Sequence, residues 1–499
     1  MSISIDPIVV ETRTGEVRGR QSEGVVAFKG IPYAAPPFGP NRFRPPVPHA
    51  RWEGVLDALG YGPTVPKPPY FPPFDVLLPE PAIPGEDCLN LNIWTPDPQA
   101  TGLPVLVWIH GGAFANGSGA VPTYDGTRFA RDGVVAVTIN YRLGVDGFLF
   151  LDDGISNLGL LDQIAALEWV RDNIAAFGGD AGKVTIAGES AGAMSVTTLM
   201  AMPRARGLFK RVIAESGAGH HALTSATAAK VGRYLAEKVG VPATREAIAA
   251  APVEKVYEAQ VALSAEAFME PNPAKWGEVA LNLMPFEPVI DGDTLPKLPI
   301  DLIREGAGRD LDLLVGTNRD EENLFLVPNG MIGAIDENLL GMVALGYQMP
   351  ADALGEYRRN RPGASPGELM SAVATDWFFR IPALRLAEVQ AAGTGANHVY
   401  EFCWRSPQFG GKLGACHALE IAFAFDNLDR EGGEPLAGEE PPQELADEMH
   451  AAWVSFIATG DPGWDRYDPA TRKVRRFGGE PTVVADPAGS ERALWEGIR

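Results

Sequence analysis

The stretch KVTIAGESAGAMSVTTLM, residues 183–200, decides the fold because it changes from strand to helix at one serine. Its first five residues form a short, largely apolar run that favours a strand, and the residues after the serine favour a helix. The GxSxG pattern around Ser190 is typical of a nucleophile elbow, a turn so tight that only small neighbours such as Gly188 and Gly192 fit. We therefore predict that Ser190 is a nucleophile, and that the N-terminus of the following helix favours negative charge beside it.

Further short apolar runs lie on both sides of this stretch. Continuous apolarity without alternation is typical of strands that helices cover on both faces. Residues 160–177 carry apolar side chains at helical spacing between two of the runs. Strand, helix and strand in this order predict a right-handed crossover and a doubly wound α/β sheet. The predicted strands are residues 105–109, 134–139, 183–187, 313–315 and 399–402.

The chain length of 499 residues suffices for two or three domains, but large α/β sheets also absorb such length as one unit. Segments at about 223–283 and 329–372 are rich in Ala, Glu and Leu with helical periodicity. We expect one domain, residues 1–499, in which these two insertions form a helical cap; a separate helical subdomain is the alternative. Prolines in residues 63–84 exclude helix and central strand, so we expect an extended surface loop there, which lines a gorge together with the cap.

Composition and charge exclude several classes of partner. Acidic residues outnumber basic ones by 64 to 42, which gives a formal charge of −22. Such a chain repels phosphate backbones and anionic membranes, so we expect no nucleic-acid partner. The sequence has no apolar run of eighteen residues, so we expect no membrane span.

The cysteines and the first residues bear on location. Cys88, Cys403 and Cys416 lack CxxC spacing, which argues against a zinc site or a redox pair and fits buried thiols in a reducing compartment. Residues 1–20 lack the basic start and apolar run of a signal peptide. We therefore expect a cytoplasmic protein.

A serine nucleophile needs a base, and in sheets of this type the partners follow in the order serine, acid, histidine. His417 lies in a Gly- and Ala-rich loop, from which its ring can reach the sheet edge. The other histidines after Ser190 come too soon after the serine, start a strand or lie in a helical stretch; they are His220, His221, His398 and His450. By elimination, His417 is the predicted base.

The acid is expected in the segment GTNRDEE, residues 316–322, which leaves a strand at its carboxyl end. Catalytic loops cluster at that end of open α/β sheets. Asp320, Glu321 and Glu322 all compete for the role, and spacing does not choose among them.

An oxyanion hole is expected in the segment HGGAF, residues 110–114, which follows the strand ending at residue 109. Backbone without bulky side chains can turn its N–H groups toward a carbonyl oxygen, and a plain tight turn is the alternative. The predicted donors are the amides of Gly112, Ala113 and Ala191, with Gly111 in support. Loss of one such donor typically costs about 3 kcal/mol of transition-state stabilisation.

Taken together, these motifs make the chain similar to the type-B carboxylesterases, a family of bacterial para-nitrobenzyl esterases, animal carboxylesterases and cholinesterases. The resemblance runs almost end to end and also rests on FKGIPYA (28–34), EDCLNLNI (86–93), NYRLG (140–144), GGD (178–180) and VIDG (289–292). It implies an α/β-hydrolase fold, with a mostly parallel central sheet, helices on both faces and a helical cap. It also implies hydrolysis of small-molecule carboxylic esters through a Ser-His-Glu triad and an acyl-enzyme. Neither cofactor nor metal is implied, and the expected state is a monomer or homodimer.

The resemblance further implies roles that spacing left open. Glu321 corresponds to the family's acid, and His417 corresponds to its histidine. Glu189 and Glu420 correspond to a buried carboxylate pair behind the histidine, where two close carboxylates do not both ionise cheaply and one holds a proton. Ser216 corresponds to a serine that hydrogen-bonds near this pair.

The chain also departs from the family. Ala113 and Glu322 stand where glycine is usual, and Ala418 follows the histidine in place of glycine. No cysteine precedes Cys88, so the disulfide of secreted relatives is absent. Aryl carbamate hydrolysis by the same triad is the alternative activity. A non-catalytic binding protein of the same fold is a further hypothesis, which the presence of serine, glutamate and histidine disfavours.

Overall fold

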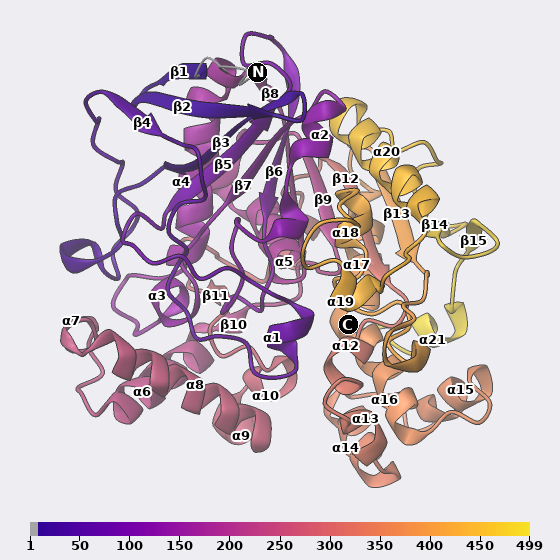
Figure 1. Cartoon of the computed structure of the whole chain (residues 1–499). Helices are drawn as coiled ribbons and strands as arrows, with labels where there is room; N and C mark the ends of the chain where they lie inside the picture. Colours follow the sequence, from indigo (N-terminus) through magenta and orange to yellow (C-terminus); the bar gives the residue numbers. More distant parts are fainter. Residues whose placement is uncertain (1–7) are drawn as a thin grey trace.

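The computed structural model describes residues 8–499 and centres on one large mixed sheet (Figure 1). Part of the segment 1–20 that was interpreted as lacking a signal peptide lies outside the described residues. Within residues 8–499 the sheet has thirteen strands in the order β1-β2-β3-β5-β7-β6-β8-β9-β12-β13-β14-β15, with β4 beside β2. The sheet and its helices confirm the predicted α/β fold.

The middle of the sheet is parallel from β7 to β14. All five predicted strands are present there, and no observed end differs from its expected position by more than four residues. The parallel strands, in spatial order, are β7 (Val135–Ile139), β6 (Leu103–Ile109), β8 (Gly179–Glu189), β9 (Arg211–Glu215), β12 (Asp312–Asn318), β13 (Asn397–Phe402) and β14 (Lys473–Phe477).

Both edges of the sheet are antiparallel. The N-terminal edge holds β1 (Ile8–Thr12), β2 (Gly15–Ser22), β3 (Val25–Pro32) and β5 (Asn90–Thr95), with β4 (Val55–Asp57) parallel to β2. The other edge is closed by β15 (Val483–Ala485).

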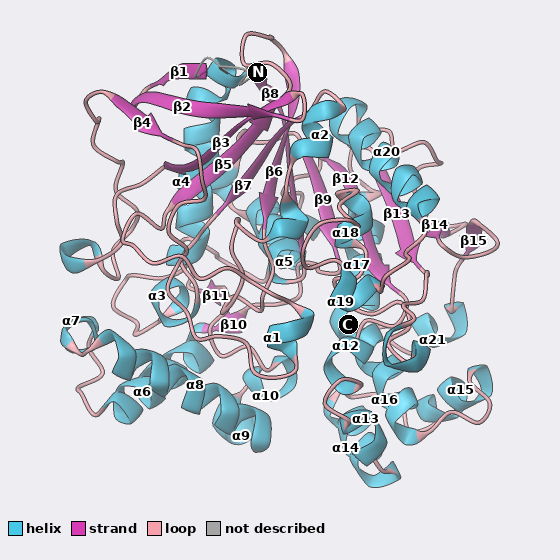
Figure 2. Cartoon of the chain, in the orientation of Figure 1, coloured by secondary structure: helices cyan, strands magenta, loops and turns pink. Residues whose placement is uncertain are grey.

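Helices cover both faces of the parallel strands, as Figure 2 shows. Alternate residues of β6 belong to two different core clusters: Val107 packs toward one face, and Trp108 packs toward the other. The first cluster includes α4 (Leu158–Asn173), α5 (Ala191–Ala201) and α17 (Ile381–Gln390). The second includes α2 (Thr127–Arg131), α18 (Ile421–Ala424) and α20 (Gln443–Thr459). This double burial explains why the strands lack polar alternation.

The two insertions are helical and form separate groups below the sheet in Figure 1. The first holds α6 (Ser225–Val239), α7 (Arg245–Ala250), α8 (Val253–Met269), α9 (Pro273–Trp276) and α10 (Val279–Asn282). The second holds α13 (Met331–Ala334), α14 (Glu337–Gly346), α15 (Ala353–Asn360) and α16 (Pro366–Thr375). The division into one domain with a cap stays a prediction.

Strand register brings the site together. Ile109 of β6 is level with Gly188 of β8, and Glu189 of β8 is level with Glu215 of β9. Because these strands are parallel, their carboxyl ends lie at the same end of the sheet. The loops after β6, β8, β9 and β12 emerge there side by side. In the described part of the chain, no helix is both long enough and apolar enough to cross a bilayer.

Candidate active site

Ser190 lies between β8 and α5 in a backbone conformation that L-residues rarely adopt, with φ 56° and ψ −123°. The turn leaves no room for side chains at its glycines. A Cβ on Gly192 would meet the Ile109 carbonyl oxygen at 2.0 Å, and a Cβ on Gly188 would meet the same oxygen at 2.5 Å. The Ser190 N–H donates to the Glu215 carbonyl at 2.9 Å, which ties the turn to β9. These contacts hold the serine at the carboxyl end of β8.

His417 contacts Glu321 inside the protein. Its Nδ1 lies 2.7 Å from Glu321 Oε2, and both side chains are buried. The other oxygen of Glu321 accepts a hydrogen bond from the Asn318 backbone N–H at 2.7 Å, which fixes the carboxylate. Asp320 instead pairs with two arginines, and neither Asp320 nor Glu322 forms an ion pair with the imidazole. Of the three carboxylates that spacing left open, Glu321 is the one in contact with the histidine.

The second ring nitrogen of His417 faces a carboxylate as well. Nε2 lies 3.0 Å from Glu189 Oε1, although that oxygen makes no hydrogen bond of acceptable geometry. Ser190 and His417 are not hydrogen-bonded to each other. Burial lowers the pKa of His417, but attraction by Glu189 and Glu321 outweighs burial and places the pKa well above its usual range. The two carboxylates therefore favour the charged form of the imidazole.

Two further glutamates lie behind this group. Glu420 accepts hydrogen bonds from Ser216 Oγ at 3.3 Å and from the Asn318 side-chain amide. Glu215 accepts a hydrogen bond from Trp453 Nε1 at 2.8 Å. Burial raises the pKa of Glu420 well above its usual range and raises the pKa of Glu215 to about 8. Burial therefore favours the protonated form of both carboxyl groups.

Burial also raises the pKa of Glu189, against the opposing effect of His417. The structure thus brings together Glu189, Glu420 and Ser216, which the resemblance had grouped. It adds Glu215, Asn318 and Trp453, which sequence reasoning missed. The sequence does contain a signal for Glu215, because it precedes Ser216 as Glu189 precedes Ser190. In the structure both serines have positive φ.

The segment after β6 turns back on itself beside Ser190. Gly112 and Ala113 have φ of 109° and 52°, in the region that favours glycine. A Cβ on Gly111 would lie 3.1 Å from Ser190 Cβ, so the glycine allows the close approach of the two segments. Within the described residues, no protein acceptor binds the amides of Gly112, Ala113 or Ala191. The three amides are available to a bound oxygen.

A cavity of about 150 Å³ connects these groups and has mainly apolar walls. Its lining includes Gly111, Gly112, Ala113, Glu189, Ser190 and His417. The loop 63–84 supplies one wall, and residues 418–436 supply another. That loop is mostly irregular, as expected, but contains one short helix, α1 (Phe74–Leu77).

The expectation that the cap lines the site is wrong for this cavity. None of its described lining residues comes from 223–283 or 329–372. The second insertion instead packs into its own hydrophobic cluster with Trp495, and Gln260 in the first insertion accepts a hydrogen bond from the Val145 N–H at 2.9 Å. These contacts bury only part of the apolar surface of the insertions, since Met269 and Leu345 stay exposed.

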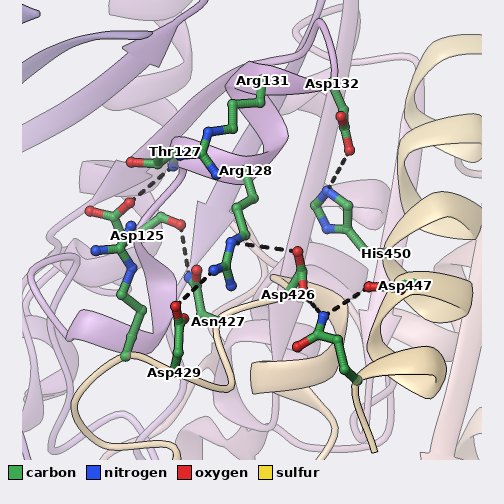
Figure 3. A network of polar contacts seen from close by, with 12 residues as sticks. Asp125, Thr127, Arg128, Arg131, Asp132, Asp426, Asn427, Asp429, Asp447 and His450 are labelled. Atoms are coloured by element: carbon green, nitrogen blue, oxygen red, sulfur yellow. Dashed lines mark hydrogen bonds and ion pairs between the residues drawn. The ribbon is translucent and has the colours of Figure 1, made fainter. Parts of the chain in front are cut away.

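The other histidines that follow Ser190 do not line the cavity. His450 of α20 has Nδ1 2.8 Å from the Ala424 carbonyl oxygen and Nε2 3.2 Å from Asp132. It belongs to a separate polar network that joins α2 to the segment 426–450, where Arg128 binds Asp429 at 2.9 Å (Figure 3). His220, His221 and His398 are also absent from the cavity lining. No group of three or more metal-ligating side chains occurs within residues 8–499.

Comparison with known proteins gives a consistent result. Residues 6–491 match the Carboxylesterase family. The para-nitrobenzyl esterase of Bacillus subtilis is 39% identical, with 97% of each chain covered, and the phenmedipham hydrolase of Pseudarthrobacter oxydans is 36% identical, with 92% and 91% covered. Among solved structures, the Geobacillus stearothermophilus carboxylesterase at pH 6.2 superposes with a TM-score of 0.86 at 39% identity, covering 98% of this chain and 99% of that one.

Proposed function

The chain belongs to the carboxylesterase family and is a carboxylic-ester hydrolase, and from this premise we propose that Ser190, His417 and Glu321 are its catalytic triad. The observation that carries the proposal is the 2.7 Å contact between His417 Nδ1 and Glu321 Oε2, beside Ser190 in one cavity. A base that a carboxylate orients is what a serine hydroxyl needs to become nucleophilic.

Acylation begins when His417 Nε2 takes the proton of Ser190 Oγ while Oγ attacks the ester carbonyl carbon. The carbonyl oxygen becomes an oxyanion, which the amides of Gly112, Ala113 and Ala191 bind. The bond to the alkoxy oxygen then breaks, and His417 gives its proton to the departing alcohol. Water, deprotonated by His417, attacks the acyl-enzyme; the acid leaves and Ser190 regains its proton. Each step uses groups of the chain and water.

The first step requires the imidazole to leave Glu189. Nε2 lies 3.0 Å from Glu189 Oε1, so the ring must turn toward Ser190 in its neutral form, with no proton on Nε2, before it can take one. Phe325 and Phe379 flank the ring, with centroids 5.4 Å and 4.7 Å from it, and restrict that movement. Glu189 thereby acts on the protonation and orientation of the base.

The preferred substrates follow from the cavity walls and the charge. Apolar walls and a formal charge of −22 favour uncharged alkyl or aryl esters over anionic ones. Because a relative is named phenmedipham hydrolase, aryl carbamates are a second candidate class.

The free, buried thiols of Cys88, Cys403 and Cys416 fit a location in the cytoplasm. For the oligomeric state we propose a monomer or homodimer.

A fluorophosphonate probe tests the assignment. Its phosphorus accepts Ser190 Oγ with loss of fluoride, so peptide mass spectrometry of the labelled protein should place the adduct on the peptide that contains Ser190. Wild type and a Ser216→Ala control should both be labelled, and Ser190→Ala should not. An adduct elsewhere would contradict Ser190 as the nucleophile, and a wild type that neither reacts nor hydrolyses esters and carbamates would favour the binding-protein hypothesis.

A further inference from the structure

Glu80 joins the loop 63–84 to the turn that carries the oxyanion amides. The loop is closed at its base, where the Thr64 N–H donates to the Ile83 carbonyl at 2.9 Å and the Ile83 N–H donates to Thr64 Oγ1 at 3.0 Å. Such a closed surface loop behaves as a packed unit rather than as a loose connection. Glu80 lies near its end and lines the catalytic cavity.

The Glu80 carboxylate binds two groups of the turn. Oε2 accepts a hydrogen bond from the Gly117 backbone N–H at 2.6 Å, and Oε1 accepts one from Asn116 Nδ2 at 3.2 Å. Asn116 Nδ2 also donates to the Pro68 carbonyl at 2.8 Å. All three hydrogen bonds therefore attach residues 116–117 to the same loop.

Residues 116–117 pack directly against the oxyanion segment. The amides of Ala115 and Asn116 donate to the Gly112 carbonyl at 2.9 Å and 2.8 Å. A Cβ on Gly117 would meet the Gly111 carbonyl oxygen at 2.4 Å, and a Cβ on Gly112 would meet the Asn116 carbonyl oxygen at 2.4 Å. Because no space separates residues 111–112 from residues 116–117, a shift of residue 117 moves residues 111 and 112 with it.

Lys67 completes the arrangement. Its Nζ lies 3.6 Å from Glu80 Oε2, and the two side chains are only 7% and 11% exposed. Burial lowers the pKa of Lys67, while the Glu80 carboxylate opposes that change. A buried carboxylate is tolerated where several donors satisfy it, and hydrogen bonds to a charged acceptor are stronger than neutral ones. The Glu80 carboxylate is thus held in place by Gly117, Asn116 and Lys67.

We propose that Glu80 is a positioning residue for the oxyanion hole: through Gly117 and Asn116 it fixes the turn that directs the amides of Gly112 and Ala113. The inference rests on the proposed function, because it assumes that these amides bind the oxyanion. Glu80 does not itself touch the reacting atoms. A misplaced donor stabilises the transition state less without changing ground-state binding.

The test compares Glu80→Ala, Glu80→Gln and Lys67→Met with wild type on para-nitrophenyl butyrate. Two inhibitors are added: an alkyl trifluoromethyl ketone, whose adduct with Ser190 carries an oxyanion, and the matching methyl ketone, which measures ground-state binding. We expect kcat of Glu80→Ala to fall about thirtyfold with KM within about threefold, since one displaced donor typically costs 10²–10³ when it is lost altogether. Glu80→Gln keeps an acceptor for Gly117 and should retain more activity.

The trifluoromethyl ketone provides the decisive readout. Its inhibition constant in Glu80→Ala should rise by the factor by which kcat/KM falls, and the constant of the methyl ketone should stay unchanged. If both constants rise together, or if kcat is unchanged, the inference is wrong and Glu80 only shapes the cavity. Asp153→Asn, which breaks a distant carboxylate–arginine pair at 2.8 Å, is the control and should keep full activity.

Two further measurements separate the possible failures. Should Glu80→Ala not fold, as shown by circular dichroism, the ordered series wild type, Glu80→Gln and Lys67→Met carries the same comparison of the two inhibitors. Ser190→Ala is measured in parallel. Full turnover in that variant contradicts the proposed function itself, whereas an inactive Ser190→Ala beside an unaffected Glu80→Ala contradicts the positioning role alone.

Discussion

His417 Nε2 lies 3.0 Å from Glu189 Oε1, a carboxylate on the residue directly before the proposed nucleophile. With Glu321 on its other nitrogen, the imidazole is charged up to an unusually high pH, since both carboxylates raise its pKa despite burial. A charged imidazole does not accept a proton. Glu189 therefore sets the pH at which the base becomes available.

Replacing Glu189 by Gln should move the acidic limb of kcat/KM to lower pH. The change removes one of the two negative charges that stabilise the imidazolium, so the pKa of His417 falls and the neutral base persists in more acidic solution. The measurement is the pH profile of kcat/KM for para-nitrophenyl butyrate. Glu11→Gln, an exposed site on β1, is the control and should not move the limb. An unmoved or raised limb in Glu189→Gln would contradict this role.

Glu321→Gln should lower kcat by about a thousandfold, because the uncharged amide no longer stabilises the imidazolium and favours the wrong ring tautomer. The neighbouring Asp320→Asn and Glu322→Gln should stay within about fivefold of wild type, because neither carboxylate contacts the ring. Steady-state turnover of all three variants decides which carboxylate is the acid. A larger loss at position 320 or 322 than at 321 would overturn the assignment.

Ala113→Gly should keep kcat within about twofold. The proposed donor is a backbone N–H, which both residues have, and φ of 52° costs glycine less than alanine. Thermal unfolding should be unchanged or occur at a slightly higher temperature. A tenfold loss of kcat would instead show that the alanine methyl group contributes to the site.

Glu215→Gln should stabilise the protein increasingly as the pH rises. Burial raises the pKa of Glu215 from 4.5 to about 8, so between these values the folded state holds a proton that the unfolded state has lost. Wild-type stability attributable to this group therefore falls with rising pH by about 1.4 kcal/mol per unit, and Gln, which mimics the protonated form, removes that loss. Thermal midpoints of both proteins at pH 5 to 8 test this. A difference that stays flat or shrinks with pH would contradict the protonated state.

The central strands were predictable because their burial on both faces leaves a continuous apolar run. Two other parallel strands, β9 and β14, were not predicted. β9 (Arg211–Glu215) begins and ends with a charged residue, and β14 (Lys473–Phe477) carries three basic ones. Their charges are satisfied by distant partners, such as Asp312 for Arg211 at 3.2 Å, and no local pattern records such pairing. The antiparallel edge strands were not predicted either, and β5 (Asn90–Thr95) was missed although it carries no charged residue.

The residues of the candidate site likewise divide into those that local sequence patterns predicted and those that depend on contacts between distant segments. Ser190 and the elimination that left His417 came from local patterns. Spacing did not choose among the three adjacent carboxylates; the family resemblance singled out Glu321, whose contact with His417 joins residues 96 apart in sequence. Glu215 and Glu80 escaped because their partners, Trp453 and Gly117, are set by sheet register and loop packing. The expectation that the two insertions line the cavity was wrong, because its described walls come from the loop 63–84, the segment 418–436 and the turns at the ends of the strands.

The central claim is that Ser190 carries the acyl group, and the most direct test is para-nitrophenol release from para-nitrophenyl butyrate by wild type and by Ser190→Ala. The account predicts steady turnover by wild type and a fall of at least about a thousandfold in the variant. Equal rates in the two proteins, or none in either, would contradict it.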